Sequence, residues 1–243
     1  MNADDDILSG DAGSDKIDGG DGADIAKFAG KQADYTFASS SDGKTITVTH
    51  VATSDADTVT NVETLSFDDG DIGVSLDTNG LVLTGSGEVD NIKIVGSVAV
   101  TVLGQDKADT LVGSTGKDII EGGAGDDTLD GGAGDDLLTG DAGDDTIDGG
   151  DGTDVAVFAG NLEDYTFASS ANGLTVTVTD TKTGDADTVT GVETLRFAGG
   201  VDIGVSRDST DGHMILTGTN AADSITIVGD VGIEVPGTDG ADI

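Results

Sequence analysis

Apolar residues recur every nine positions from Gly104 to Val157, and each is separated from the next by a glycine-rich acidic stretch. The centre of this array reads GGAGDDTLD GGAGDDLLT GDAGDDTID GGDGTDVAV. The first six positions of each nonad favour tight turns, and the last three predict a short strand with one inward-facing residue. So short a strand is stable only when neighbouring nonads stack. The inward-facing positions are Leu111, Ile120, Leu129, Leu138, Ile147 and Ala156.

An aspartate occupies the sixth position of all six nonads: Asp109, Asp118, Asp127, Asp136, Asp145 and Asp154. On these residues the chain resembles the RTX, or haemolysin-type calcium-binding, repeat family. The resemblance implies a parallel β-roll with two nonads per coil, so that turns on one edge lie 18 residues apart in sequence and about 4.8 Å apart in space. We therefore predict an all-β fold in which blocks of parallel β-roll (a calcium-binding β-solenoid) are interleaved with small antiparallel β segments.

Stacked carboxylates at that spacing predict a cation site. Two such charges repel by roughly 3–4 kcal/mol at an effective dielectric constant of 20. Carboxylates and glycine carbonyls offer only oxygen ligands, which favours calcium over zinc, and we expect on the order of five to eight ions. A flexible acidic tract would share the composition, but it would not keep an apolar residue at every eighth position. The predicted ligands are Asp6, Asp15, Asp24, Asp90, Asp109, Asp118, Asp127, Asp136, Asp145, Asp154, Asp223 and Asp242, with Asp126, Asp135, Asp144 and the carbonyls of Gly122, Gly131 and Gly140 as additional candidates.

The coil geometry also predicts which carboxylates face each other. Asp90 precedes Asp109 by 19 residues, which is one coil with one extra residue. The strand that contains Val98, Val100 and Val102 brings no aspartate, so that edge of its coil should lack metal. Asp154 is expected to close its column. The predicted pairs are 6–24, 90–109, 109–127, 118–136, 127–145, 136–154 and 223–242.

A longer repeat overlies the nonads. Residues 28–67 and 158–197 align at a shift of 130, with 27 of 40 positions identical. Both ends of the sequence fall inside nonads, so we expect a piece of a longer tandem protein. The predicted domains are a partial RTX β-roll (1–27), a β-rich intervening or capping segment (28–84), an RTX β-roll (85–157, core nonads 104–157), a second intervening segment (158–217) and the truncated start of another β-roll (218–243).

The intervening segments have the pattern of strands. Tyr35–Phe37 and Thr45–Thr49 alternate apolar and polar residues around the turn at 41–43, which predicts a hairpin. Further strands are expected at 59–67 and 80–84. All six Phe and both Tyr lie in the two segments. We expect a unit that packs over an end of each roll, with an exposed sugar-binding face as the alternative.

Composition narrows the function. The 243 residues carry a formal net charge of −38, which disfavours nucleic acid and anionic membranes as partners. The chain contains no Cys, so bound metal would have to replace disulfides as a staple. No apolar stretch is long enough to span a membrane, and the first residues do not form a signal peptide. The family resemblance instead implies type I secretion through an uncleaved C-terminal signal, hence an extracellular location, with or without attachment to the cell surface.

Catalytic motifs are lacking. The two histidines, His50 and His213, have no counterpart in the other copy, and neither HExxH nor GxSxG occurs. We therefore predict a non-catalytic fragment, although the resemblance leaves room for an enzyme elsewhere in the parent chain. The leading hypothesis is a calcium-folded structural or adhesive repeat region, with calcium, neighbouring modules or other copies as partners. The alternatives are a folding and secretion module of an enzyme or toxin, and a module that binds cell-surface polysaccharide.

Overall fold

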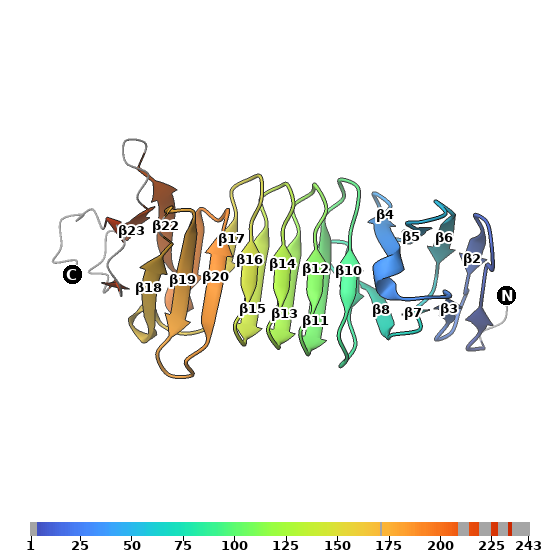
Figure 1. The fold of residues 1–243 in the computed structure, drawn as a ribbon. Coiled ribbons are helices and arrows are strands. Elements are labelled where there is room, and N and C mark those ends of the chain that lie inside the picture. Colours follow the sequence, from blue (N-terminus) through green and yellow to red (C-terminus); the bar gives the residue numbers. More distant parts are fainter. Residues whose placement is uncertain (1–3, 171, 209–213, 219–224, 228–232, 235–243) are drawn as a thin grey trace.

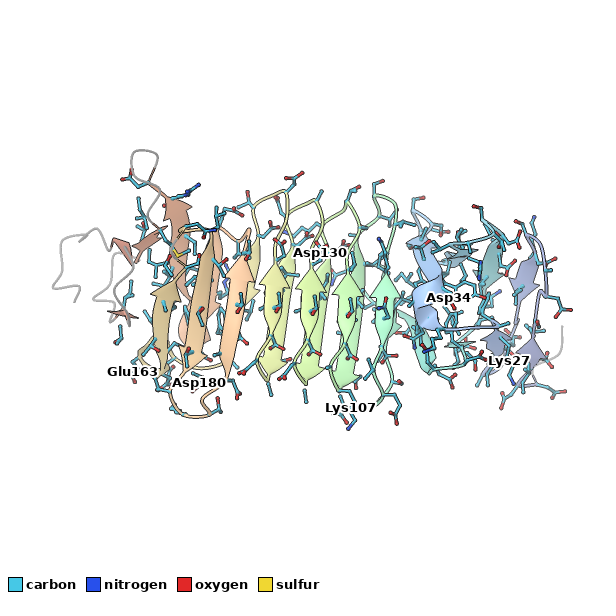
Figure 2. The ribbon with its side chains drawn as sticks, viewed as in Figure 1. Lys27, Asp34, Lys107, Asp130, Glu163 and Asp180 are labelled. Atoms are coloured by element: carbon cyan, nitrogen blue, oxygen red, sulfur yellow. The ribbon has the colours of Figure 1, made fainter. Side chains whose placement is uncertain are left out.

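The computed structural model describes residues 4–170, 172–208, 214–218, 225–227 and 233–234. These residues form an elongated β-solenoid whose strands lie across its long axis (Figure 1). Within the described residues, regular structure is almost entirely β, with three short 3₁₀ turns: η1 (Gln32–Asp34), η2 (Leu162–Asp164) and η3 (Ala198–Gly200). Asp34 of η1 and Glu163 of η2 are labelled in Figure 2. The predicted all-β class with parallel β-roll blocks is confirmed. No helix within the described ranges is long and apolar enough to cross a membrane.

One face of the solenoid is a 13-stranded sheet that continues from the first roll, through the first intervening segment, into the second roll. Its members pair in parallel within the rolls and antiparallel at β7–β8–β9 and β21–β22–β23. In spatial order the strands are β1 (Ile7–Leu8), β3 (Ile25–Lys27), β7 (Thr64–Ser66), β8 (Asp71–Leu76), β9 (Leu81–Thr84), β11 (Val100–Asp106), β13 (Ile119–Ala124), β15 (Leu137–Ala142), β17 (Val155–Val157), β21 (Thr194–Phe197), β22 (Val201–Arg207), β23 (Met214–Thr217) and β25 (Ile233–Glu234).

The opposite face consists of two sheets. A backbone bridge between Phe37 and Ile94 joins them at the point where the first segment meets the second roll. The four-stranded sheet contains β2 (Lys16–Asp18), β6 (Ala56–Thr60), β5 (Thr45–His50) and β4 (Tyr35–Ser39). The eight-stranded sheet contains β10 (Asn91–Lys93), β12 (Thr110–Val112), β14 (Thr128–Asp130), β16 (Thr146–Asp148), β20 (Ala186–Thr190), β19 (Thr175–Asp180), β18 (Tyr165–Ser169) and β24 (Thr226–Ile227).

The stacking step of the roll is 18 residues, as predicted. Strand β12 pairs with β14 through Leu111 and Leu129, and β14 pairs with β16 through Leu129 and Ile147. The same step relates Ile120 to Leu138 on the other face. Every apolar residue at the eighth position is fully buried between the two sheets. The core of the roll therefore consists of two facing ladders of aliphatic side chains, to which each nonad contributes one residue.

The intervening segment continues the roll. Strand β20 pairs in parallel with β16 (Ile147 opposite Val189), and β21 pairs in parallel with β17 (Ala156 opposite Leu195). Residues 186–197 thus form one more coil. The antiparallel hairpin β18–β19 is inserted before that coil and packs beside β20. The expectation that the segment packs over the end of a roll is corrected here: it carries both sheets onward, since Val189 and Leu195 occupy the positions of the apolar ladder.

The hairpin predicted over Tyr35–Thr49 forms as β4 and β5. The strand expected at 59–67 is instead two strands, β6 and β7, because the chain turns at Asn61, whose φ is +50°. Aromatic rings fill the space under the hairpin. Phe28 stacks on Phe67 at 5.4 Å, and Phe158 stacks on Phe197 at 5.3 Å. The two copies of the segment thus have the same core.

Candidate metal centre

Two columns of carboxylates run along the edges of the roll, where the turns enter the strands. In the column that precedes the β12–β14–β16 strands, the N–H of Asp109 donates to Oδ1 of Asp127 (2.7 Å) and that of Asp127 to Oδ1 of Asp145 (2.8 Å). Asp90 enters the same column, since its N–H donates to Oδ1 of Asp109 (2.8 Å). Each carboxylate therefore reaches back to the preceding coil.

The second column has the same construction. The N–H of Asp118 donates to Oδ1 of Asp136 (2.7 Å), and the N–H of Asp136 donates to Oδ1 of Asp154 (2.8 Å). Near the start of the chain, the N–H of Asp6 donates to Oδ1 of Asp24 at 2.8 Å. The structure thus brings together six of the seven predicted pairs. The seventh, between Asp223 and Asp242, lies outside the described residues.

The columns extend further than the sequence suggested. The N–H of Asp145 donates to Oδ1 of Asp187 (3.0 Å), and that of Asp154 donates to Oε2 of Glu193 (2.8 Å). Asp154 was expected to close its column, and it does not. In the first copy, Asp15 and Asp24 make the equivalent bonds to their counterparts, Asp57 (2.8 Å) and Glu63 (2.8 Å). Sequence reasoning missed these four residues because they stand outside the nine-residue period. The repeated runs DADTVT and VETL contain them and are the signal that could have found them.

The second oxygen of most of these carboxylates is buried and unpartnered. Asp109, Asp127, Asp136, Asp145 and Asp154 are at most 2% exposed. Burying an ionised oxygen without a partner is costly. A cation would remove that cost. The Oδ2 atoms that are buried without a hydrogen-bond partner belong to Asp15, Asp24, Asp109, Asp127, Asp136, Asp145 and Asp154.

The first glycine of each nonad leaves space for an ion beside that oxygen. A Cβ added to Gly104 would lie 2.5 Å from Oδ2 of Asp109 and against the carbonyl of Gly122. A Cβ on Gly131 would meet Oδ2 of Asp136 and a backbone carbonyl of the next coil, both at 2.6 Å. A carboxylate and a carbonyl from successive coils therefore converge on one point, and the absent side chain keeps that point open.

Burial raises the pKa of these carboxyls. Desolvation is the largest cause for Asp109 and Asp136, whose pKa values rise to about 7, and the neighbouring carboxylates of each column add to the rise. The same cause raises the pKa of Asp145 to about 6 and that of Asp187 to about 7. The charged forms are thus disfavoured until a positive charge balances them.

Asp90 and Asp118 have protein partners at Oδ2, the atom that is unpartnered in Asp109, Asp127, Asp136, Asp145 and Asp154. At Asp90 this partner is the N–H of Ser86 (2.5 Å). Asp90 accepts a 2.6 Å hydrogen bond at Oδ1 from Nε2 of Gln32, a fully buried side chain that the sequence analysis did not single out. Asp118 accepts the N–H of Ser114 at Oδ2 (2.6 Å). Asp118 is the first carboxylate of its column, next to the valine strand. At these two positions, hydrogen-bond donors of the chain satisfy the carboxylate.

The additional candidate ligands are used differently. The fifth-position carboxylates lie at the exposed rim, where Asp126 and Asp135 each accept an N–H from the next coil at 3.0 and 3.1 Å. Asp144 likewise accepts the N–H of Ala186 at 2.8 Å. Of the candidate carbonyls, that of Gly122 lies beside the Gly104 space and that of Gly131 beside the equivalent space at Gly113.

The arrangement suits a hard cation with many oxygen ligands. In the part of the chain that the structure describes, no three Asp, Glu or His side chains converge into a ready-made cluster. The spaces at Gly104, Gly113, Gly131 and Gly149 are instead bordered by a side-chain carboxylate and a backbone carbonyl, which is the mixed donor set of calcium sites. Thiolate ligands are excluded because the chain has no Cys. The buried, unpartnered Oδ2 atoms and the open glycine spaces fit calcium.

Comparison with known proteins agrees with this geometry. The family model described as RTX calcium-binding nonapeptide repeat matches four copies, at residues 2–26, 103–138 and 125–156. The chain contains RTX calcium-binding nonapeptide repeats. RTX repeats bind Ca²⁺, and they occur in extracellular proteins secreted by the type I route. RTX repeat regions are non-catalytic.

Among solved structures, the extracellular lipase LipA from Serratia marcescens is similar, with 20% identity and a TM-score of 0.30. The match covers 78% of this chain and 35% of the lipase chain. A search of curated proteins gave no match. The residues that the repeat model matches lie within the rolls and outside both intervening segments.

Proposed function

We propose that the chain is a calcium-folded structural and adhesive repeat region of a large secreted or cell-surface RTX protein. The observation that supports this function most is the continuity of the sheets. Strand β9 at the end of the first segment pairs in parallel with β11 of the second roll, and β17 of that roll pairs in parallel with β21 of the second segment. Modules joined in this way form a rod whose length grows with each repeat. The five domains, with the bounds predicted from the sequence, remain part of the proposal.

Calcium would be the agent that orders this rod. The buried carboxylates oppose the fold at neutral pH, and the cation offsets their repulsion and completes their coordination. At free calcium ten times the dissociation constant, each site would contribute about 1.4 kcal/mol. Several sites together reach the stability of a whole domain, about 5–15 kcal/mol. We therefore expect a largely unfolded chain without calcium and a β-rich chain with it.

The alternative functions have less support. An exposed sugar platform needs aromatic rings at the surface, and all six Phe and both Tyr are at most 8% exposed. A folding and secretion module attached to an enzyme would not need duplication of the 130-residue unit. Reading the parent gene separates this possibility from the structural one: further copies of the unit favour the rod, and an adjoining catalytic domain favours the appendage.

The decisive experiment combines spectroscopy with size measurement. Circular dichroism in chelator and then in millimolar calcium should change from a disordered to a β spectrum. A β spectrum that persists in chelator would contradict the proposal. Light scattering under the same conditions tests our further expectation that copies associate reversibly when calcium is present, by stacking as the modules do. A strictly monomeric chain at high concentration would exclude such stacking.

A further inference from the structure

The coil formed by residues 186–197 repeats the edge geometry of the nonads without their sequence. Thr188 stacks on Thr146 in parallel register, and its N–H donates to the carbonyl of Asp145 at 2.7 Å. Within the array, the N–H of Thr146 donates to the carbonyl of Asp127 in the same way, at 2.8 Å. Asp187 therefore stands where the sixth residue of a nonad would stand, although the nine-residue pattern ends near residue 157.

Glu193 occupies the equivalent position on the other edge. In a nonad, the aspartate follows the first glycine by five positions, whereas Glu193 follows Gly191 by only two. The glutamate is one methylene longer, and its Oε2 still accepts the N–H of Asp154 at 2.8 Å. The longer side chain thus compensates for the shorter turn.

The open space beside Asp154 is also preserved. A Cβ added to Gly149 would lie 2.8 Å from Oδ2 of Asp154 and against the carbonyl of Gly191. That Oδ2 is fully buried and has no hydrogen-bond partner. The turn keeps its carbonyl in place through a positive φ of +62° at Gly191. A buried, unpartnered carboxylate oxygen and a backbone carbonyl therefore point into one space, as they do within the array.

The first copy shows the same arrangement independently. A Cβ on Gly19 would lie 2.5 Å from Oδ2 of Asp24 and against the carbonyl of Asn61. Asn61 has a φ of +50°, close to that of Gly191. The N–H of Asp24 donates to Oε2 of Glu63, and Oδ2 of Asp24 is again buried and unpartnered. The two copies thus keep the same space, although the first has Asn61 where the second has Gly191.

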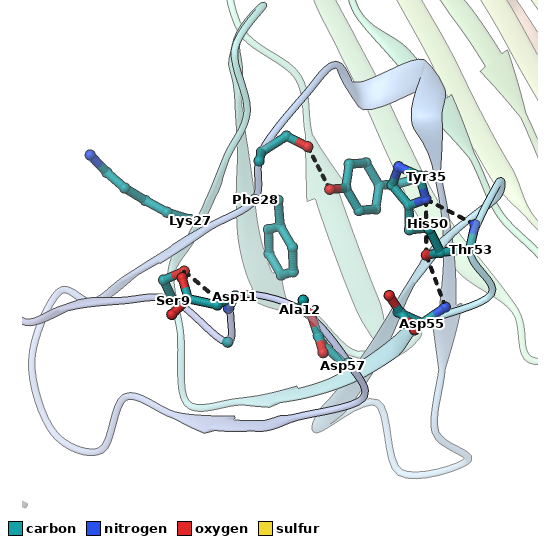
Figure 3. A pocket seen from close by; sticks show the side chains of 13 residues that line it. Ser9, Asp11, Ala12, Lys27, Phe28, Tyr35, His50, Thr53, Asp55 and Asp57 are labelled. Carbon is teal, nitrogen blue, oxygen red and sulfur yellow. Dashed lines mark hydrogen bonds between the residues drawn. The ribbon is translucent and has the colours of Figure 1, made fainter.

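A cavity adjoins the other edge of this coil in both copies. In the first copy it has a volume of about 290 Å³, and Figure 3 shows Asp11, Asp55 and Asp57 around it, next to Tyr35. In the second copy it has a volume of about 160 Å³, and its lining includes the equivalent residues Asp141, Tyr165, Asp185 and Asp187.

We propose that the coil of residues 186–197 is a further calcium-binding coil, with Asp187 and Glu193 as its ligands, one at each edge, and that Asp57 and Glu63 play the same role in the first copy. This inference rests on the proposed calcium-dependent fold. The nonapeptide array would then end inside the intervening segment. Calcium bound at its last coil would link each roll to the segment that follows it, so that folding of one module stabilises the next.

The first test is the calcium stoichiometry of the full chain by titration calorimetry. Glu193→Gln and Asp187→Asn should each lose about one ion, since a calcium site depends on its anionic oxygens. Glu163→Gln and Asp71→Asn remove the same charge from exposed positions outside both columns and should lose none. Circular dichroism in saturating calcium checks that each variant is folded. Unchanged stoichiometry in both test variants would overturn the inference.

The second test leaves the proposed ligands unchanged. The chain has no Trp and two Tyr, and each Tyr lines one of the two cavities. Terbium, used as the probe, should therefore give tyrosine-sensitised emission that falls by about half in Tyr35→Phe and again in Tyr165→Phe. If the chain bound calcium in calorimetry but gave no sensitised emission, this inference would be overturned and the proposed function would stand. A wild-type chain that binds no calcium would instead overturn the proposed function.

Discussion

The N–H of Asp118 donates a 2.7 Å hydrogen bond to Oδ1 of Asp136, a residue one coil later. This relationship gives the columns a direction, because each carboxylate stabilises the backbone of the coil before it and offers its other oxygen to the space beside its own glycine. Each carboxylate therefore links the site beside its own glycine to the backbone of the preceding coil.

The first prediction compares two positions in one column. Asp136→Asn should raise the calcium midpoint of folding by about tenfold, or about 1.4 kcal/mol, because its Oδ2 is buried without a partner beside the Gly131 space. Asp118→Asn should raise it much less, because Ser114 already donates to Oδ2 of Asp118. Calcium titration followed by circular dichroism measures both. Equal midpoints in the two variants would show that the hydrogen-bond partner of Oδ2 does not decide which carboxylates bind calcium.

The second prediction concerns the glycine space. Gly104→Ala should weaken calcium binding and destabilise the calcium-loaded fold, because its methyl group would occupy the point between Oδ2 of Asp109 and the carbonyl of Gly122. Gly87→Ala is the matched control, since its nearest neighbour is a side-chain oxygen 3.9 Å away and its φ is not positive. Thermal unfolding in saturating calcium should separate the two variants. Similar losses of stability in both variants would mean that replacing any turn glycine destabilises the fold, whether or not it borders a metal space.

Much of this structure could be predicted from the nonads alone. The strict apolar eighth position determines the buried ladder of Leu111, Leu129 and Ile147, and the 18-residue step follows from two nonads per coil. The facing aspartate pairs follow from the same step. All of these features are determined by the nine-residue period, because each contact joins equivalent positions of nonads two repeats apart.

The coil beyond the array could not be read in this way. Asp187 lies 42 residues after Asp145 because a hairpin is inserted between them, and Glu193 lies 39 residues after Asp154. Such insertions break the period while the strands keep their register. The pairing of Gln32 with Asp90 was equally hidden, because it joins residues 58 apart that share no pattern.

The third prediction concerns pH. The folded-state pKa values of Asp109 and Asp136 are raised to about 7, well above the value of about 3.9 for an unfolded chain. A raised pKa contributes stability that is present at acid pH and is lost as the pH rises through the folded value. In chelator, the chain should therefore show more β structure at pH 5 than at pH 8. Saturating calcium should reverse the order, because protons compete for the ligands. Circular dichroism at both pH values measures this, and a chelated chain that is equally unfolded at pH 5 and pH 8 would contradict it.

The fourth prediction tests the amide that meets Asp90. Gln32 donates to Oδ1 of Asp90 at 2.6 Å and accepts the N–H of Asn91 at 2.8 Å, and all of its side chain is buried. Gln32→Leu places here the residue that the second copy carries at Leu162. It would remove both hydrogen bonds, leaving a buried carboxylate oxygen and a backbone N–H with one partner fewer.

The expected cost is about 1–3 kcal/mol of unfolding free energy in saturating calcium. Gln32→Glu is the informative companion, because it keeps the shape and the acceptor for Asn91 but sets a second negative charge against Asp90. That variant should be the less stable of the two at low calcium and should recover as calcium rises, whereas Gln32→Leu should not recover. Chemical unfolding at two calcium concentrations distinguishes them. If both variants responded to calcium alike, Gln32 would be a packing residue and not the neutral partner of a column that begins at Asp90.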